Sequence, residues 1–429
     1  MSLVGSTSTS GGAPGPDVPA PTRTRWLPRA GFPMVLLSVA GLIVVLSAVA
    51  AVTGAEDLTS SGTIGAALAL AIPIGMAGLG GLWAERAGVV NIGLEGMMIL
   101  GTWGAGWAGY QWGPWTGVLV GVLMGAIGGL VHAVATVTFG VDHIVSGVAI
   151  NILGLGATQF LSVVAFEGVQ GGGESQSPPI ADIREISLPG LKEPLLDLQE
   201  KGIFLVSDLA GVVRGVMTGV SLLTLVAILL VIGSYVVLWR TAFGLRLRAC
   251  GENPVAAESL GVNVYLMKYA AVIASGGFAG IGGAFLAIEL GNGYREGQVA
   301  GRGFIGLAAM IFGNWRPGGL AAGAGLFGYA DALQLRRGEE SVHALLLLVG
   351  VLLVAAAIWL AVRRRPVAAA LAAASGALFL VWFAFTDIVP EQFTTMTPYV
   401  TTLLVLALAS QRLRMPAADG QPYRKGQGG

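Results

Sequence analysis

The residues that could do chemistry in this sequence gather in residues 81–96, GLWAERAGVVNIGLEG, between two apolar runs. Glu85, Arg86, Asn91 and Glu95 stand there close together. Polar and charged groups in an apolar environment usually face a cavity, a polar path or a partner group. Two interpretations are therefore open. Asn91 and Glu95 line a polar path, or Glu95 pairs with Arg86 or caps a helix end and holds the stretch in shape.

Two more amides, Asn151 and Gln159, lie in another apolar run and are spaced so that one face of a helix can present both. Amides donate and accept hydrogen bonds, so they suit a neutral, hydroxyl-rich solute. They also form hydrogen bonds between packed helices. Asn91, Glu95, Asn151 and Gln159 are therefore the candidate lining of a polar path, with a packing role as the alternative.

The composition shows what surrounds these groups. The 429 residues are 54% hydrophobic and 11% charged, whereas soluble proteins carry about 25% charged residues. The net charge of zero gives no reason to expect a nucleic-acid partner. The single cysteine excludes an intrachain disulfide and a cysteine-rich metal site. The 67 glycines predict helices that pack closely within a membrane.

Apolar runs long enough to cross a bilayer core of about 30 Å recur along the chain. They predict an all-α polytopic membrane protein of about 10–12 transmembrane segments, including short or re-entrant helices. The segment at 303–313 is too short to cross alone and indicates a half-helix. The expected spans are 33–53, 61–82, 90–110, 116–138, 144–166, 217–238, 268–289, 303–313, 318–333, 342–362, 367–386 and 395–410.

The charges of the connecting segments predict an orientation. Arginine and lysine gather in alternate connections, and such loops face the cytoplasm. Both termini are then cytoplasmic. The expected parts are a disordered tail 1–30, a transmembrane domain 31–411, an extracellular loop 167–216, a cytoplasmic loop 240–267, an extra hairpin 342–386 and a tail 412–429.

A weak internal repeat links two of the segments. Residues 87–97, AGVVNIGLEGM, share six of eleven residues with residues 300–310, AGRGFIGLAAM. Broken helices in corresponding places of two halves are typical of transporters, and they lie beside the substrate path.

The cytoplasmic loop 240–267 has the signals of a short, rigid helix. Asn253 and Pro254 can open it, Ala256 and Ala257 favour it, and Gly261 can close it in the left-handed conformation. We expect such an element to fix a partner by charge and shape, although an ordinary solvated loop is the alternative. The residues predicted to contact the partner are Arg246, Arg248, Gly251, Glu252, Asn253, Pro254, Ala256, Ala257 and Gly261.

Catalytic and metal-binding patterns are absent from the sequence. It holds no phosphate-cradling Walker motif, no HExxH and no nucleophile elbow in a strand–turn–helix context. His132, Asp142 and His143 stand near a predicted helix end as exposed polar residues, and their spacing fits no common metal site. We therefore assign no catalytic residue and no metal ligand.

Several segments in this order resemble one family. They are GLWAERAGVVNIGLEGMM, DHIVSGVAINIL, FGLRLRACGENPVAAESLGVNV, GRGFIGLAAMIFGNW, FGYADALQLR, TPYVTTLLVLA and GQPYRKG, and they span most of the chain. They resemble permease subunits of ATP-binding cassette (ABC) importers, in the nucleoside and simple-sugar uptake branch of the branched-chain amino acid/ribose permease superfamily. The sequences of these segments are most similar to those of purine nucleoside permeases. The hairpin 342–386 departs from the family pattern.

The resemblance implies a transport subunit rather than an enzyme, with no cofactor bound by this chain. Separate cytoplasmic ATPase subunits would use ATP and dock on the loop 240–267. A second permease subunit, identical or not, and an extracellular or periplasmic solute-binding protein are the other implied partners. The implied location is the bacterial cytoplasmic membrane. The alternatives are a sugar or branched-chain amino acid ABC permease and, from another class, an ion-coupled secondary transporter.

Overall fold

The computed structural model describes residues 32–187, 190–336, 338–394, 396–397 and 413–426. The chain divides into two units, Met1–Leu42 and Ile43–Gly429. The described part of the first unit is the beginning of helix α1 (Phe32–Thr53). The predicted tail 1–30 and almost all of the predicted span 395–410 lie outside the described residues.

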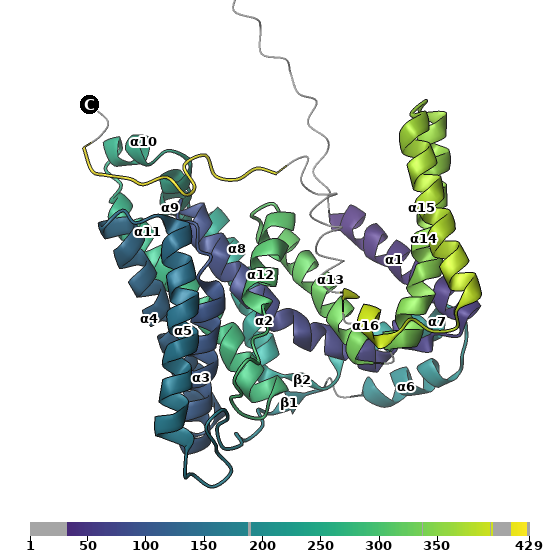
Figure 1. Cartoon of the computed structure of the whole chain (residues 1–429), viewed down its shortest axis with the longest axis horizontal. Coiled ribbons are helices and arrows are strands. Elements are labelled where there is room, and N and C mark those ends of the chain that lie inside the picture. The colour runs from purple at the N-terminus through teal and green to yellow at the C-terminus, as the bar shows by residue number, and fades with distance from the viewer. Residues whose placement is uncertain (1–31, 188–189, 337, 395, 398–412, 427–429) are drawn as a thin grey trace, which may run out of the picture. The chain divides into compact units, whose positions relative to one another are not determined.

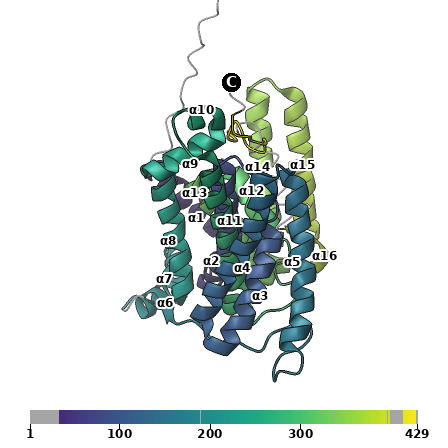
Figure 2. The same ribbon diagram turned by 90° about the vertical axis from the view of Figure 1, so that its left-hand side faces the viewer.

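The second unit is built mainly of helices, and several of them follow one another through short connections (Figures 1 and 2). Its helices are α2 (Ser61–Arg86), α3 (Leu94–Trp112), α4 (Pro114–Ala133), α5 (His143–Phe166), α6 (Lys192–Glu200), α7 (Val206–Met217), α8 (Leu222–Arg240), α9 (Ala242–Glu252), α10 (Pro254–Ser259), α11 (Val264–Phe285), α12 (Arg302–Phe312), α13 (Pro317–Leu335), α14 (Gly338–Val362), α15 (Pro366–Phe385) and α16 (Glu391–Thr394). The short strands β1 (Glu185–Ile186) and β2 (Val220–Ser221) pair in antiparallel register.

Seven helices within the described ranges are long and apolar enough to cross a bilayer, and they confirm the all-α polytopic membrane fold. Each expected span from 33–53 to 367–386 overlaps a helix, and several ends differ by four or five residues. The span expected at 90–110 begins only at Leu94, because residues 90–93 are not helical. The span expected at 217–238 begins only at Leu222, because Val220 and Ser221 pair with β1 instead of joining the helix.

Helices α4 and α11 show why this chain needs so much glycine. A β-carbon at Gly125 would lie 2.3 Å from the carbonyl oxygen of Gly276, and one at Gly276 would lie 2.2 Å from that of Gly125. A β-carbon at Gly129 would likewise lie 2.5 Å from the carbonyl oxygen of Val272 on α11, and one at Gly280 would lie 2.3 Å from that of Gly121 on α4. The backbones therefore touch directly, as the glycine content predicted.

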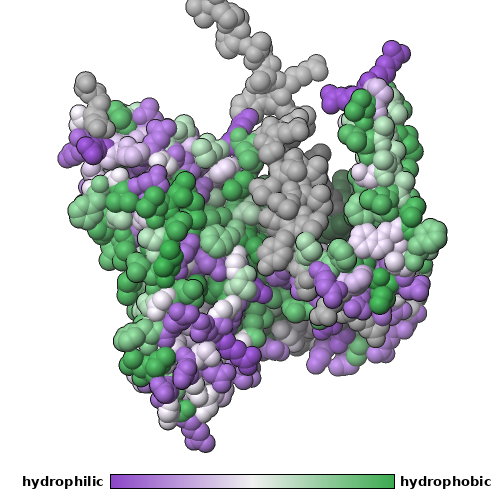
Figure 3. Space-filling model, viewed as in Figure 1, coloured by the Kyte–Doolittle hydropathy of each residue, from purple (hydrophilic) through white to green (hydrophobic). Residues whose placement is uncertain are grey.

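Burial differs between the inner and outer helices. α2 and α11 are largely buried, whereas α4 and α5 expose leucine, isoleucine and valine along their outer faces. Figure 3 shows apolar surface along the helices and polar surface at their ends. The hairpin α14–α15 is also mostly exposed and apolar, and its helices approach each other where Gly350 meets Gly376. These exposed faces are suited to lipid.

The region 167–216, expected as a loop, contains β1, α6 and α7. α6 and α7 are short and are not among the membrane-crossing candidates. α7 packs on the beginning of α2, where Gly215 and Gly211 lie against the backbone of Ser61 and Thr59. A search for long apolar runs does not detect helices of this kind.

Candidate functional site

Helix α2 ends in a cap that favours glycine. Gly88 has φ +81°. The N–H groups of Gly88 and Val89 donate to the carbonyl oxygens of Glu85 and Ala84, at 2.9 and 3.0 Å. This pair of bonds closes a helix with a left-handed residue. Residues 87–93 then run without regular helix until α3 begins, so the break between the apolar runs is real.

A second break precedes α12, and Glu95 joins the two. The N–H groups of Gly301 and Gly303 each donate to one oxygen of the Glu95 carboxylate, at 2.8 Å. Glu95 is 9% exposed and caps the beginning of α12. The structure therefore supports the helix-cap interpretation. Pairing of Glu95 with Arg86 is wrong, because Arg86 lies 3.9 Å from the carboxylate of Glu252 instead.

The capped end of α12 lies deep among the helices. α12 runs beside α2 in the same direction, with Gly306 against Gly78 and the Trp315 Nε1–H donating to Glu85 Oε2 at 2.5 Å. From Gly78 to the end of α2 is about 12 Å along the helix axis. Glu95 therefore lies well within the length of α2, where broken backbone needs protein partners.

Two predicted amides supply such partners. Asn91 is fully buried. It donates to Ser275 Oγ on α11 at 2.8 Å and accepts from the N–H of Gly93 at 3.1 Å. Asn151 on α5 accepts from the N–H of Gly96 at 2.8 Å and donates to a carbonyl oxygen of the break at 3.1 Å. Both side chains thus satisfy backbone groups that a continuous helix would pair internally.

Gln159 lies apart from this cluster. It is two turns beyond Asn151 on α5, about 12 Å along the axis, and its Nε2 donates to Glu296 Oε1 at 2.5 Å in an exposed position. The structure therefore gathers Asn91, Glu95 and Asn151 around the first break and leaves Gln159 outside it. That these residues line a solute path stays a prediction.

Two histidines that the sequence placed on an exposed helix end are buried. His132 Nε2 donates to the carbonyl oxygen of Val90 at 3.0 Å, and His143 Nδ1 accepts from the N–H of Val90 at 3.2 Å. The expectation of exposure is wrong because the break folds back onto α4 and α5. Asp142 caps α5 by accepting from the N–H groups of its first turn. No group of three or more possible metal ligands occurs within the described ranges.

An ion pair missed by the sequence analysis lies beside the second break. Arg302 Nη2 is 3.7 Å from Asp331 Oδ2 on α13, and both side chains are mostly buried. Arg302 Nη1 also donates to the carbonyl oxygens of Gln298 and Val299. The sequence signal was present, since each residue is a lone charge in an apolar run.

The loop between α8 and α11 folds as predicted. Asn253 Oδ1 accepts from the N–H of Ala256 at 3.0 Å, and Pro254 is the first residue of α10. Gly261 follows the helix with φ +82°. The N–H of Gly261 donates to the backbone carbonyl oxygen of Glu258 at 2.8 Å, which completes the closing turn. Asn253, Pro254 and Gly261 thus define a short rigid helix.

This loop touches the first break directly. A β-carbon at Gly251 would lie 2.3 Å from the carbonyl oxygen of Arg86. Glu252 faces the Arg86 guanidinium. The ring of Trp239 lies 5.4 Å from the guanidinium carbons of both Arg86 and Arg248. The α9–α10 loop therefore lies directly against the end of α2 and the residues that follow it.

The outer surface of the loop is partly apolar. Leu260 is 85% exposed, and Val255 and Leu245 are also exposed. Exposed apolar groups ringed by polar ones mark interaction surfaces. Of the predicted contact residues, the exposed ones are Arg246, Glu252, Asn253, Ala256 and Gly261, and the buried or half-buried ones are Arg248, Gly251, Pro254 and Ala257.

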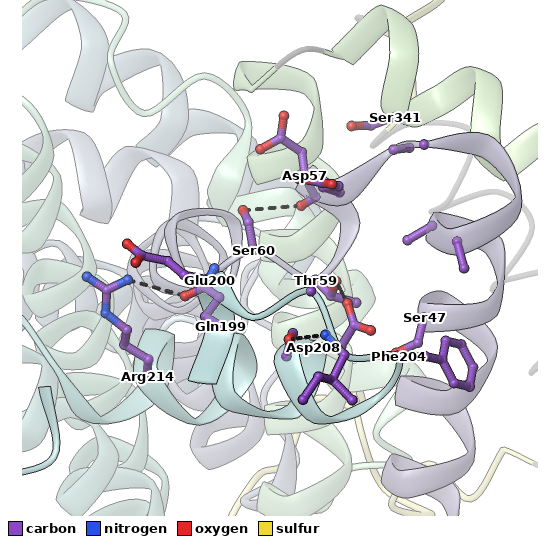
Figure 4. Close-up of a pocket in the computed structure, with 18 of the residues that line it drawn as sticks. Ser47, Asp57, Thr59, Ser60, Gln199, Glu200, Phe204, Asp208, Arg214 and Ser341 are labelled. Carbon is purple, nitrogen blue, oxygen red and sulfur yellow. Dashed lines mark hydrogen bonds between the residues drawn. The ribbon is translucent and has the colours of Figure 1, made fainter. Parts of the chain in front are cut away.

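A polar cavity of about 850 Å³ lies at the opposite end of α2 (Figure 4). Thr59 donates to Asp208, and Arg214 Nη1 donates to Gln199 Oε1 at 3.2 Å. Ser60, which caps α2, also lines the cavity. None of the four candidate path residues lines it. The cavity is thus separate from the helix breaks.

Comparisons with known proteins agree with this architecture. The chain is 34% identical to a guanosine ABC transporter permease protein, NupQ of Bacillus subtilis, over 84% of this chain and 96% of the relative. It is 33% identical to a nucleoside ABC transporter permease protein, NupC of Lactococcus lactis, over 82% and 93%. It is 32% identical to a putative glucose ABC transporter permease protein, TsgC13 of Haloferax volcanii, over 85% and 98%.

No solved structure matches the chain. Residues 63–357 match the model of one protein family, a range that runs from the first turn of α2 into α14 and includes both helix breaks and the α9–α10 loop. With this match and the relatives above, the chain belongs to the family of the branched-chain amino acid transport system permease component.

Proposed function

We propose that this permease imports nucleosides, driven by a separate ATPase that docks on α9–α10. The solute is inferred from the relatives named for guanosine and nucleosides. The observation that carries the mechanism is the backbone contact of Gly251 with Arg86 at the first helix break. It joins an exposed, rigid helix to the buried polar cluster around Glu95.

The mechanism is alternating access without chemistry on the solute. Binding and hydrolysis of ATP change how strongly the partner interacts with each of two states of the permease. Such a difference in interaction shifts the equilibrium between the two states. Residues 87–93 are free of a helical hydrogen-bond ladder, so they can change conformation when Gly251 moves. The Glu95 carboxylate passes that change to α12, because it holds the N–H groups of Gly301 and Gly303.

The remaining partners follow from this role. A second permease subunit and an extracellular binding protein would complete the importer, and ATP would be bound by the partner alone. Both termini would face the cytoplasm. This orientation is supported by the described C-terminal residues, since the N–H of Ala418 donates to Gly251 in the loop that would meet the ATPase.

Two alternatives differ in solute or energy source. The relative named for glucose makes a sugar the second candidate solute. An ion-coupled transporter would need no ATPase. The exposed Val255 on α10 and Leu260 directly after it argue against this alternative, because they offer a docking surface.

The decisive experiment is mild detergent purification of the tagged chain from its own host, with mass spectrometry of what accompanies it. A stoichiometric protein with a Walker motif supports the ATP-driven importer. Recovery of the chain alone, under conditions that keep other importers intact, would overturn it. Leu260→Glu should remove the ATPase from the sample. Ile203→Glu, also at an exposed position but in the connection between α6 and α7, is the matched control and should retain it.

The solute is tested by uptake. Cells that produce the complete transporter should accumulate radiolabelled guanosine, and unlabelled nucleosides should compete while glucose should not. Competition by glucose alone would replace the nucleoside with a sugar. In either case the Leu260→Glu variant should lose uptake.

A further inference from the structure

The described C-terminal residues 413–426, here named the C-terminal strap, lie along α9 and α10 (Figure 1). They have no helix or strand, yet they make specific backbone contacts. The N–H of Ala418 donates to the carbonyl oxygen of Gly251 at 2.9 Å, and the N–H of Ala417 donates to Glu252 Oε2 at 3.3 Å. The N–H of Arg414 donates to Asn314 Oδ1 at 2.8 Å, just after α12.

The strap, the α9–α10 loop and the first break meet at one point. A β-carbon at Gly88 would lie 3.2 Å from both the carbonyl oxygen of Ala418 and the Cα of Gly251. Further along, Gly420 has φ +74° and lies against Val90, the residue that both buried histidines bind. This close fit of three backbones shows that the strap follows a defined course across the break.

An aromatic contact fastens the far end of the strap. The ring of Tyr423 lies 5.6 Å from that of Tyr265 at the beginning of α11. Tyr423 also packs on a buried apolar cluster formed by Cys250, Ala257 and Val264. Through Tyr423 the strap therefore contacts α9, α10 and α11 together.

Asp419 inserts a carboxyl group beneath the strap. It is 8% exposed, and its oxygens make no hydrogen bond of good geometry with the described residues. Burying a carboxyl group without such bonds is costly, so the surrounding contacts must hold the strap in place. The charged groups near it are Glu85 and Arg86 on α2, Lys268 on α11 and Glu252 on α9.

We propose that the C-terminal strap is a positioning element that clamps the α9–α10 loop to the first helix break, so that movement of the loop reaches residues 87–93. This inference rests on the proposed function. Without the clamp, the loop can move with its ATPase while the break stays still. The strap residues that act are Ala418, which bonds to Gly251, and Tyr423, which packs on the loop.

The single cysteine of the chain provides a direct probe of docking. Cys250 is fully buried beside Tyr423. Burial raises the pKa of the Cys250 thiol to about 11, so a maleimide should label it slowly. Release of the strap uncovers the cluster and should speed labelling. This assay needs neither a solute nor ATP, and it therefore reports on the strap even if the proposed function fails.

Two strap variants test the clamp in the full complex. Ala418→Pro removes the N–H that bonds to Gly251, and Tyr423→Ala removes the aromatic contact. Loss of one hydrogen bond corresponds to a shift of about fivefold to tenfold in the ratio of docked to released strap. We expect Cys250 labelling to rise by about that factor, ATP hydrolysis to continue, and solute transported per ATP to fall. Lys425→Pro, beyond these contacts, is the matched control and should behave as wild type.

The outcomes separate the two proposals. Unchanged labelling and unchanged transport per ATP in both variants would overturn the clamp. Faster labelling with wild-type transport per ATP would also overturn it, since the strap would then only cover the cluster. A wild-type complex that carries no ATPase contradicts the proposed function instead, whatever the labelling shows. Size-exclusion profiles identify a variant that fails to fold, and the other variant then decides.

Discussion

Replacing Glu95 with glutamine is the sharpest test of the helix breaks. The carboxylate accepts one N–H from Gly301 and one from Gly303, both at 2.8 Å, at the beginning of α12. Glutamine keeps a single carbonyl oxygen and places an NH2 group where the second oxygen was. One glycine N–H would then face another donor inside the protein, and the negative charge at the helix N-terminus would be lost.

The expected loss follows from these two contacts. A hydrogen bond to a charged group contributes about 1.5–3 kcal/mol, and a partly buried charge at a helix terminus adds up to about 2 kcal/mol. Because glutamine keeps one of the two bonds, we expect Glu95→Gln to cost about 2–4 kcal/mol. Glu95→Ala removes both acceptors and should cost more.

Thermal unfolding of the purified protein, followed by tryptophan fluorescence, measures this loss, and solute uptake measures function in parallel. Gln159→Ala is the control, because Gln159 is exposed and should change stability by less than about 0.5 kcal/mol. A cap role predicts reduced stability with or without solute. If Glu95→Gln unfolds at the wild-type temperature and only weakens the apparent affinity for solute, the cap interpretation is refuted and the path-lining one stands.

Three further predictions use other contacts. Gly251→Ala forces a β-carbon to within 2.3 Å of backbone and should lower uptake about tenfold. Gly233→Ala places its β-carbon in open space and should leave uptake unchanged. Equal uptake by the two variants would contradict the loop–break contact. Asp331→Asn removes the counter-charge of Arg302 and should lower the free energy of unfolding by about 3 kcal/mol. Adding Arg302→Gln should recover part of this lost stability. A double variant that recovers none would argue against the ion pair. Burial raises the pKa of Asp419 above its usual value of about 3.9. Docking of the strap should therefore be strongest in acid and weaken as the pH rises above that usual value, while Asp419→Asn should reduce this pH dependence of transport per ATP.

The features that could be predicted from the sequence are those that depend on residues close together along the chain. Apolar run length located the helices, and the order of Asn253, Pro254 and Gly261 predicted α10 with both of its ends. The first break was visible because Glu85 to Glu95 interrupt two apolar runs. Each of these signals lies within one turn or one span of the structure it predicts.

The partners of the polar residues could not be predicted in this way. Glu95 binds backbone more than 200 residues away, and Glu252 binds Ala417 in the strap. His132 looked like an exposed residue at a helix end, since nothing near it in sequence shows that Val90 returns to cover it. A backbone N–H has the same chemistry at every position, so a side chain that binds one leaves no pattern in the sequence.

The two helix breaks are connected to each other through the Glu95 carboxylate. In a continuous helix, each peptide group is hydrogen-bonded to groups four residues away, so a displacement of one end moves the whole helix. Residues 87–93 are held instead by side chains from other helices, including Asn151, Lys268 and the two buried histidines. These bonds can be exchanged one at a time. Because Glu95 also holds the beginning of α12, a shift of the first break must either carry α12 along or break two charged hydrogen bonds. The weak repeat thus places two helix breaks in contact, and the α9–α10 loop lies against the first of them.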